Sequence, residues 1–409
     1  MNDVSRLVRA FVPGERVFMP GSAGEVPALT AALADGPPLD ITASFVTGIN
    51  KLPLAHLPEG SHWNGLFAQP STTGAHGRGI FRQSVHSYGG YALALARGPG
   101  FDTCIVQVAP PDQNGNCSLG VAVEFTPIAV RKSRRVLAVI NPRMPHIAGA
   151  ASLPYRDFAV VAEIDAPLRE YQVGAPSALA TRIAKRIATY IEDGAALQIG
   201  LGKVPDALLR LLTDRRRLRL HSGMLSDGAQ LLAESGSLDP NFAHTSCVHV
   251  GTQSYYDWLA GRTDFAVRGC DQTHAPATLA GMSGLIAVNS ALSVDLFGQA
   301  NLEMLDGRAI SSVGGAADFA RAASFSADGI SIIALPATSG SSDLPRIVPR
   351  LDGICSLPRQ DVDVVITEHG AADLRGLSVF ERGTALIAVA APQHRPALEA
   401  AFSDIIRIL

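Results

Sequence analysis

The feature that most constrains the fold of this chain is an internal repeat. Residues 12–48, VPGERVFMPGSAGEVPALTAALADGPPLDITASFVTG, resemble residues 191–228, IEDGAALQIGLGKVPDALLRLLTDRRRLRLHSGMLSDG. Each stretch has a short apolar run, a glycine turn, Val-Pro, an amphipathic segment, a second apolar run and another glycine turn. Pro27 aligns with Pro205, and proline is tolerated in the first turn of a helix. Each copy therefore predicts a strand–helix–strand unit.

Two such units predict two duplicated α/β domains with largely parallel sheets, because a helical crossover joins parallel strands. The chain has 409 residues, which is long for a single core. Further apolar runs predict buried strands at residues 101–109, 136–141, 331–337 and 363–368. Helical spacing of apolar residues over 176–191 predicts the start of the second domain. We expect an N-terminal domain over residues 1–174 and a C-terminal domain over residues 175–409.

Composition excludes several classes of function. The net charge is −3, so the chain has no basic field that would recruit nucleic acid. The five cysteines show no CxxC spacing and the histidines show no HxH or HExxH grouping, so the sequence predicts no disulfide framework and no metal site. No apolar run approaches membrane-spanning length. We therefore expect a cytoplasmic protein with no membrane partner.

Glycine turns that open helices are the candidate binding elements. Gly200 and Gly202 follow an apolar run and lead, through Lys203, into an amphipathic segment. Gly314 and Gly315 stand before another such segment. Free backbone amides at these turns can hold an anion or stabilise a carbonyl oxygen. The first turn lacks the third glycine of a dinucleotide fingerprint and the GK[ST] of a Walker loop, and a plain connecting turn is the alternative.

Residues 218–228, LRLHSGMLSDG, predict a buried strand that ends in a polar turn. His221, Ser222 and Asp227 crowd the end of this strand, where side chains commonly carry chemistry. The central residue of the turn, Gly223, has no side chain. Ser222 lacks the G-x-S-x-G elbow, so a hydrolase triad is disfavoured.

The order of motifs resembles the acetyl-CoA hydrolase/transferase family, and within it the 4-hydroxybutyrate and butyrate-type class I CoA-transferases. The motifs are GLGKVPDALL, LRLHSGMLSDG, NSALSVDLFGQAN, SSVGGAADFARAA, IIALPAT, RIVP and VDVVITEHGAADLRGLS, with PPDQNGNCSLG in the first half. The resemblance implies two α/β domains with an acyl-CoA site between them. It also implies coenzyme A esters and small carboxylates as substrates, no permanently bound cofactor, and a homodimer or higher oligomer.

The resemblance further implies a catalytic glutamate, which attacks the thioester and forms an acyl-glutamyl anhydride. In the family this glutamate stands in a motif H-[ST]-E-M, and here its position is Gly223. The HSGM form, together with PGSAGE near the N-terminus, resembles an itaconate CoA-transferase-like branch. The remaining implied binding positions are retained, and they are Gly200, Gly202, Lys203, Asn289, Gly314 and Gly315.

Three routes remain open without the glutamate. Another acid acts, with Glu25, Glu124 and Glu303 as candidates, or the acceptor carboxylate attacks the thioester directly. Alternatively, His221 or Asp227 serves as acid or base in a different reaction. We predict an acyl-CoA:carboxylate CoA-transferase. The alternatives are a CoA-ester lyase or decarboxylase, an acyl-CoA thioesterase, and a non-catalytic acyl-CoA-binding protein.

Overall fold

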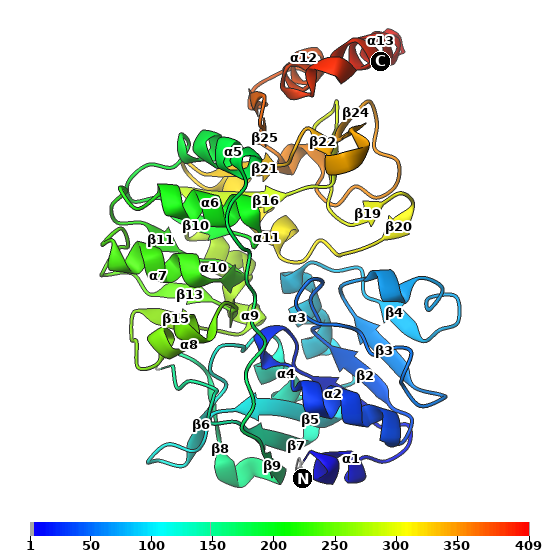
Figure 1. The fold of residues 1–409 in the computed structure, drawn as a ribbon, viewed down its shortest axis with the longest axis vertical. Helices are drawn as coiled ribbons and strands as arrows, with labels where there is room; N and C mark the ends of the chain where they lie inside the picture. Colours follow the sequence, from blue (N-terminus) through cyan, green and yellow to red (C-terminus); the bar gives the residue numbers. More distant parts are fainter. Residues whose placement is uncertain (1–3, 148, 409) are drawn as a thin grey trace. The chain divides into compact units, whose positions relative to one another are not determined.

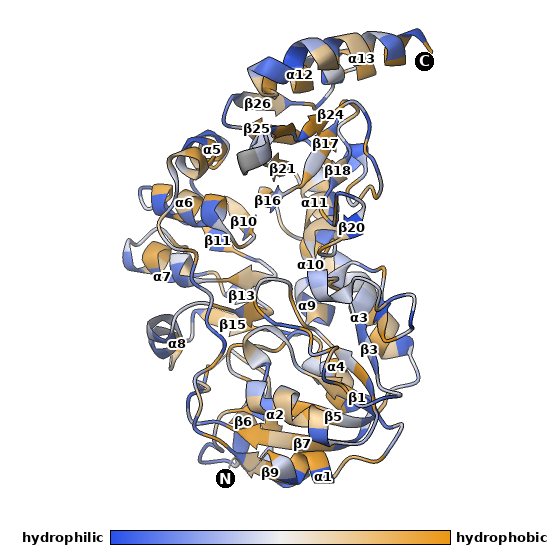
Figure 2. Ribbon diagram, turned by 45° about the vertical axis from the view of Figure 1, so that its right-hand side comes forward, coloured by the Kyte–Doolittle hydropathy of each residue, from blue (hydrophilic) through white to orange (hydrophobic). Residues whose placement is uncertain are grey.

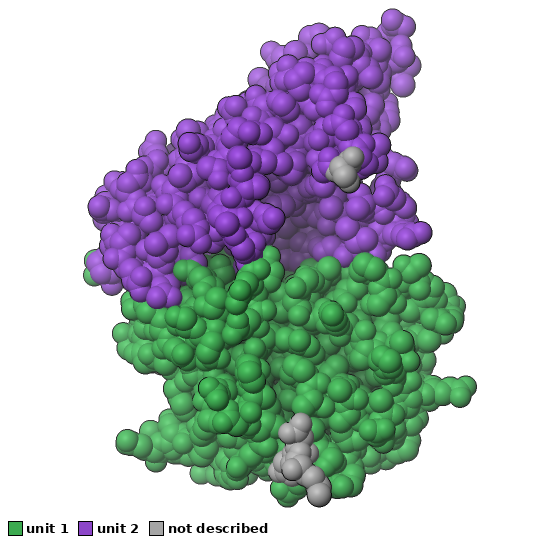
Figure 3. All heavy atoms as spheres, in the orientation of Figure 1, with its two compact units in different colours: residues 1–172, 222–227, 241–275 green, residues 173–221, 228–240, 276–409 purple. Residues whose placement is uncertain are grey.

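The computed structural model describes residues 4–147 and 149–408, which divide into two compact units (Figures 1 and 3). The first unit comprises Met1–Gln172, Ser222–Asp227 and Asn241–Ala275. The second unit comprises Val173–His221, Gly228–Pro240 and Pro276–Leu409. Two short later segments of the chain therefore pack with the first unit.

The first unit is built on a seven-stranded parallel sheet with strand order β4-β3-β2-β1-β5-β7-β9. Its strands are β1 (Arg16–Met19), β2 (Asp40–Ala43), β3 (His62–Gly65), β4 (Phe81–Gln83), β5 (Phe101–Val108), β7 (Ser133–Ile140) and β9 (Phe158–Glu163). The helices are α1 (Ser5–Arg9), α2 (Pro27–Ala32), α3 (Tyr88–Arg97) and α4 (Thr126–Arg131), with 3-10 turns η1 (Ser22–Gly24), η2 (Leu33–Asp35), η3 (Pro70–Thr72) and η4 (Tyr155–Asp157). An antiparallel pair, β6 (Asn116–Ser118) and β8 (Ser152–Pro154), completes this part.

The later segments add two small parallel pairs to the first unit. These are β12 (Met224–Leu225) with β14 (Val248–His249), and β13 (His244–Ser246) with β15 (Phe265–Val267). Helices α8 (Gln253–Leu259) and α9 (Cys270–Thr273) accompany them. Backbone hydrogen bonds tie these segments to the earlier chain, since His249 N donates to Val121 O at 2.7 Å and Cys270 N donates to Glu124 O at 2.8 Å.

The second unit has a six-stranded sheet with order β11-β10-β16-β21-β25-β26, parallel except for β26. Its strands are β10 (Ala196–Ile199), β11 (Arg219–Leu220), β16 (Leu285–Ser290), β21 (Ile330–Ala334), β25 (Val364–Thr367) and β26 (Gly370–Asp373). Its helices are α5 (Ala178–Ala188), α6 (Lys203–Leu211), α7 (Asp227–Glu234), α10 (Pro276–Ala280), α11 (Ala316–Phe325), α12 (Val379–Val389) and α13 (Arg395–Arg407). Helices α5 and α6 cover one face of the sheet and α10 and α11 the other (Figures 1 and 2).

The second unit also contains short strands and 3-10 turns outside its six-stranded sheet. They are the strands β17 (Ser293–Asp295), β18 (Ala300–Asn301), β19 (Met304–Leu305), β20 (Arg308–Ala309), β22 (Thr338–Ser339), β23 (Leu344–Pro345) and β24 (Ile347–Val348), and the 3-10 turns η5 (Gly340–Ser342), η6 (Arg359–Asp361) and η7 (Pro392–His394). Among the described residues, no helix is both long enough and apolar enough to cross a membrane.

The predicted repeat is confirmed. Strand β1 pairs in parallel with β2 across α2, and β10 pairs in parallel with β11 across α6. Proline lies in the first turn of each helix, opening α2 and standing third in α6. The registers correspond as well, because Val17 faces Ile41 in one unit and Leu197 faces Leu220 in the other.

Each unit has its own apolar core, visible as the hydrophobic strands of Figure 2. In the first unit Ile105 and Leu137 of neighbouring strands pack with Leu29 of α2. In the second unit Ile333 and Val365 belong to a cluster that reaches the C-terminal helices. The four apolar runs predicted as strands are β5, β7, β21 and β25, and the predicted helix over 176–191 is α5. The α/β class with parallel sheets is therefore confirmed.

Candidate active site

The first predicted glycine turn caps a helix of the second unit. Gly200 follows the carboxyl end of β10, and Gly202 is the residue that precedes α6. Gly202 has φ 130° and ψ 179°, a conformation that glycine adopts and other residues avoid. Lys203 opens α6 with an exposed side chain. The amides of the first helical turn are thus presented at the carboxyl edge of the sheet, where parallel α/β sheets bind ligands.

Asn289 stands one residue from the end of β16, the strand next to β10. Its side-chain amide pairs with that of Gln198 on β10, with Asn289 Nδ2 donating to Gln198 Oε1 at 3.1 Å and the reverse bond at 3.3 Å. Both side chains are buried. This pair fixes the orientation of an amide beside the Gly200 turn.

The second glycine turn opens α11. Gly314 has φ 56°, and Gly315 is the residue that precedes the helix. Glu303, a candidate nucleophile in the sequence, accepts a hydrogen bond from the backbone just before this turn. Its Oε1 accepts from Val313 N at 3.1 Å and its Oε2 accepts from Ser356 Oγ at 2.7 Å. The structure therefore gives the Glu303 carboxylate a part in shaping the loop.

His221 directly follows β11, and its N–H donates to Leu197 O at 3.0 Å. Its ring is buried and lies 6.0 Å from the ring of Phe319 on α11. The imidazole therefore belongs to the same carboxyl edge of the sheet as the glycine turns. Within the second unit, one sheet edge gathers the predicted residues Gly200, Gly202, Lys203, His221, Asn289, Gly314 and Gly315.

Gly223 belongs to the first unit, in the turn before β12. Its carbonyl oxygen accepts from the backbone N of Cys247 and Val248, each at 3.2 Å, and from Cys247 Sγ at 3.0 Å. A Cβ atom added at this position would lie 3.3 Å from Nε2 of His274. The functional group nearest to the missing side chain is therefore the imidazole of His274, which the sequence did not single out.

Glu25, a second candidate acid, is a buried member of an ion pair in the first unit. Arg169 donates to both of its carboxylate oxygens, Nε to Oε2 at 2.8 Å and one terminal nitrogen to Oε1 at 3.1 Å. Asn50 Nδ2 donates to Oε2 at 2.7 Å. Because Glu25 is buried and Arg169 is partly exposed, losing these donors would leave a buried carboxylate without its partners, so this carboxylate has a structural role that competes with nucleophilic attack.

Glu124 is the most strongly perturbed carboxyl group described. Its oxygens accept from Ser22 Oγ at 2.7 Å and from Ser44 Oγ at 2.5 Å. Burial raises the pKa of Glu124 from 4.5 to about 7, and the two hydroxyl donors moderate that shift. The backbone of Glu124 is left-handed, with φ 38°. A sequence cannot show such a shift, because the burial and both donors come from distant parts of the chain.

A buried group of Cys247, Cys270 and His274 adjoins Gly223. The ligand atoms of all three side chains lie within 4.8 Å of one another. Cys270 opens α9 and His274 directly follows the helix, so the sequence signal for this pair is a C-x3-H spacing of four residues. Cys247 lies 23 residues earlier, between β13 and β14. The group is not visible in the sequence because Cys247 is distant in the chain from Cys270 and His274, so the three form no local motif.

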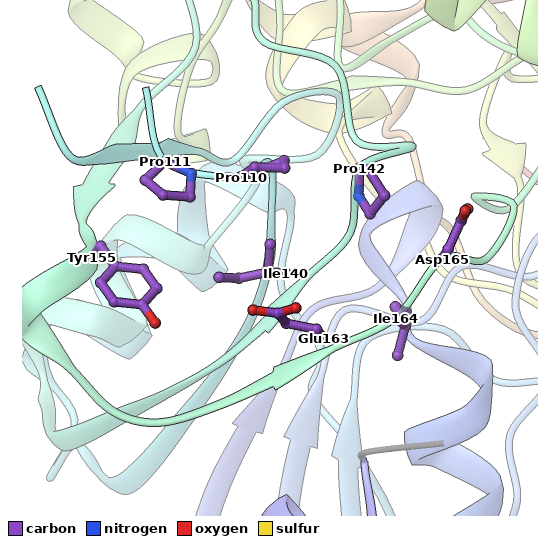
Figure 4. Close-up of a pocket in the computed structure, with 8 residues that line it drawn as sticks. All are labelled: Pro110, Pro111, Ile140, Pro142, Tyr155, Glu163, Ile164 and Asp165. Carbon is purple, nitrogen blue, oxygen red and sulfur yellow. The ribbon is translucent and has the colours of Figure 1, made fainter. Parts of the chain in front are cut away.

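A cavity of about 570 Å³ opens at the carboxyl ends of β7 and β9 in the first unit. Figure 4 shows the eight side chains that line it, which are Pro110, Pro111, Ile140, Pro142, Tyr155, Glu163, Ile164 and Asp165. These described lining residues include two acids and no Lys or Arg. This lining therefore offers no direct cationic contact to the phosphates of a coenzyme A ester.

The chain has duplicated parallel sheets, and in the second unit glycine turns open helices at one sheet edge, an arrangement that can bind anionic or carbonyl groups. Residues 76–163 match the acetyl-CoA hydrolase/transferase N-terminal domain, and residues 251–402 match the C-terminal domain. The chain belongs to the acetyl-CoA hydrolase/transferase family, as its motifs predicted.

Relatives and solved structures agree with this assignment. The chain is 34% identical to a 4-hydroxybutyrate coenzyme A transferase from Clostridium kluyveri, over 73% of this chain and 71% of the relative. It is 26% identical to an acetyl-CoA hydrolase from Kluyveromyces lactis, over 78% of this chain and 69% of the relative. The structure of RipA from Yersinia pestis superposes with a TM-score of 0.88 at 27% identity, covering 98% of this chain and 96% of RipA. A 4-hydroxybutyrate CoA-transferase from Porphyromonas gingivalis gives 0.80 at 27% identity, covering 100% and 97%.

Proposed function

We propose that this protein transfers coenzyme A from an acyl-CoA to a small carboxylate, and that the acceptor carboxylate attacks the thioester directly. Relatives named as CoA-transferases support the reaction class. The observation that carries the direct route is that none of the candidate glutamates has a free, exposed carboxylate. Position 223 has no side chain, and Glu25, Glu124 and Glu303 are all buried and hydrogen-bonded within the fold.

In the proposed reaction, an acceptor carboxylate oxygen attacks the thioester carbon and a tetrahedral oxyanion forms. Amides at the Gly200–Gly202 turn and at the Gly314–Gly315 turn stabilise that oxyanion, each lowering the barrier by about 2.7–4 kcal/mol. The intermediate expels the coenzyme A thiolate and leaves a mixed anhydride. The thiolate then attacks the acceptor carbonyl of the anhydride, which gives the new thioester and releases the donor carboxylate. Binding both substrates together replaces the covalent enzyme intermediate.

The test combines kinetics with trapping. Incubation with an acyl-CoA and isotopically labelled acetate is expected to yield labelled acetyl-CoA, with initial rates that follow a sequential pattern. After treatment with acyl-CoA alone, borohydride reduction is expected to leave every glutamate unmodified. A mass shift on Glu25, Glu124 or Glu303 contradicts the direct route.

Other products of the same incubation identify the alternatives. Free thiol that appears without an acceptor indicates hydrolysis, the activity named for the yeast relatives. Release of CO₂ indicates a lyase. Binding without turnover across a panel of acyl-CoA esters indicates a non-catalytic protein. Each of these three results overturns the proposed transfer reaction.

Two substitutions at one position sharpen the test. Gly223→Glu restores a carboxylate where the family motif has one, and Gly223→Ala is its control because it adds only the Cβ that approaches His274. We expect a borohydride-trappable acyl-enzyme in Gly223→Glu and not in the parent or the alanine variant. If transferase activity is low in the parent and rises strongly in Gly223→Glu alone, the glycine is a loss of function and the direct route is wrong.

A further inference from the structure

Three soft donor groups converge in the interior of the first unit. Cys247, Cys270 and His274 are all 0% exposed, and their ligand atoms lie within 4.8 Å of one another. Tetrahedral zinc has Zn–S bonds of ~2.3 Å, which places neighbouring ligand atoms about 3.8 Å apart. The observed spacing is therefore within about an ångström of the spacing that one ion needs.

Hydrogen bonding prepares His274 for ligation. Thr273 Oγ1 lies 2.8 Å from His274 Nδ1 and also donates to Gly269 O at 3.3 Å. With its own hydroxyl proton directed to that carbonyl, Thr273 can accept a proton from Nδ1, and that tautomer leaves the lone pair of the imidazole on Nε2 for a metal ion. Metal-bound histidines show this arrangement, in which the second ring nitrogen is fixed by an outer partner. Nε2 is the atom that approaches position 223, beside Cys247.

An independent observation comes from Tyr88 of α3. Its side chain is 3% exposed, and within the described part of the chain its hydroxyl has no hydrogen-bond partner. Its ring centroid lies 5.2 Å from that of His274. Buried hydroxyl groups are nearly always paired, so an unpaired one here points to a partner that the polypeptide does not supply.

We propose that Cys247, Cys270 and His274 bind one Zn²⁺ ion, with the Tyr88 hydroxyl beside the fourth position. Two thiolates and one imidazole are a donor set that thiophilic cations prefer and that Mg²⁺ and Ca²⁺ do not. On binding, the two thiols release their protons to solvent and form two Zn–S bonds. The charges of the two thiolates and the ion cancel, so no net charge is buried. This site does not depend on the proposed CoA transfer.

The experiment uses the full-length protein produced in zinc-supplemented medium. We expect one equivalent of zinc by elemental analysis after gel filtration. Replacement by Co²⁺ is expected to give the intense near-ultraviolet thiolate-to-cobalt charge-transfer band. Cys247→Ser and Cys270→Ser should each lose the band and the bound zinc. Cys104→Ser is the matched control, because Cys104 is equally buried in β5 of the same unit and should leave both signals unchanged.

A further variant reports on the fourth position. Tyr88→Phe removes only the hydroxyl, and we expect it to weaken zinc binding about 10- to 100-fold while the charge-transfer band persists at saturating Co²⁺. An unchanged zinc affinity in this variant overturns the role of Tyr88.

Three results overturn the site itself. The first is a folded parent protein that retains no zinc and shows no cobalt band, a result that stands even if the serine variants fail to fold. The second is a Cys104→Ser variant that loses metal as fully as Cys247→Ser. The third is intact mass showing a Cys247–Cys270 disulfide in the metal-free parent, since oxidised sulfurs are not thiolate ligands. Bound copper in place of zinc overturns the assignment to Zn²⁺.

Discussion

At the scale of single residues, Glu124 links pH to stability. The folded state raises its pKa from 4.5 to about 7, so folding favours the protonated form. Between these pH values the folded protein binds more protons than the unfolded chain, and the free energy of unfolding falls as pH rises, by roughly 3 kcal/mol in all. Denaturant unfolding from pH 4.5 to 8 should show this decline in the parent. Glu124→Gln should flatten it, and equal pH slopes in the two proteins would contradict the assignment.

For single residues, the sequence predicted the missing side chain at position 223 but not the groups that surround it. The motif LRLHSGMLSDG alone shows that position 223 has no side chain that could react. The structure was needed to show that His274 is the neighbour of Gly223. His274 is 51 residues further along the chain, and helix α9, which precedes it, brings its ring close to this position. Likewise, the sequence could not show that Val313 N and Ser356 Oγ donate to the two carboxylate oxygens of Glu303.

At the scale of elements, the turn before α6 depends on one glycine and tolerates change at another. Gly202 has φ 130°, so Gly202→Ala is expected to lower the free energy of unfolding by about 1–3 kcal/mol. Gly200 has no heavy atom within 4 Å of an added Cβ and no positive φ, so Gly200→Ala should change it by less than about 0.5 kcal/mol. Thermal and denaturant unfolding of both variants measures the contrast. Equal losses would show that the turn is not fixed by the Gly202 backbone.

Element prediction succeeded where the apolar pattern was long. Strands β5 and β7 have eight residues each, and α5 has eleven with a clear apolar face. Each is long enough for its apolar residues to show a recognisable pattern in the sequence. The two-residue strands β12 and β14 and the four-residue helix α9 are too short to show a period. These short elements are the ones that position Gly223, Cys247 and Cys270, and so the surroundings of the candidate site were the least predictable part.

At the scale of the whole molecule, the two units are interleaved in sequence. The sequence predicted one domain over residues 175–409, and no local pattern in it indicated that residues 222–227 and 241–275 pack with the first unit. The βαβ repeat, by contrast, was readable because its strands and helix are consecutive in each copy. Contacts between segments distant in sequence leave no periodic signal in a single chain.

Interleaving predicts how the protein responds to being cut. A fragment of residues 1–172 lacks the later segments whose backbone pairs with Val121 and Glu124, so we expect it to be insoluble or to unfold without a cooperative transition. Co-production with a fragment of residues 173–409 should restore solubility, and the two pieces should copurify. Gel filtration and circular dichroism of the separate and joint products provide the measurement. A monodisperse 1–172 fragment that unfolds cooperatively would show that the later segments are dispensable.

The hydrogen bond from His249 N to Val121 O also bears on how such genes can recombine. A crossover near residue 172 would join the early strands of one parent to the 241–275 segment of another, so that Val121 and its partner come from different lineages. Hybrids should survive such exchange only where both parents keep compatible packing on each side of that contact. In this chain the inherited module is consequently larger than the first 172 residues, and it is not contiguous in the gene.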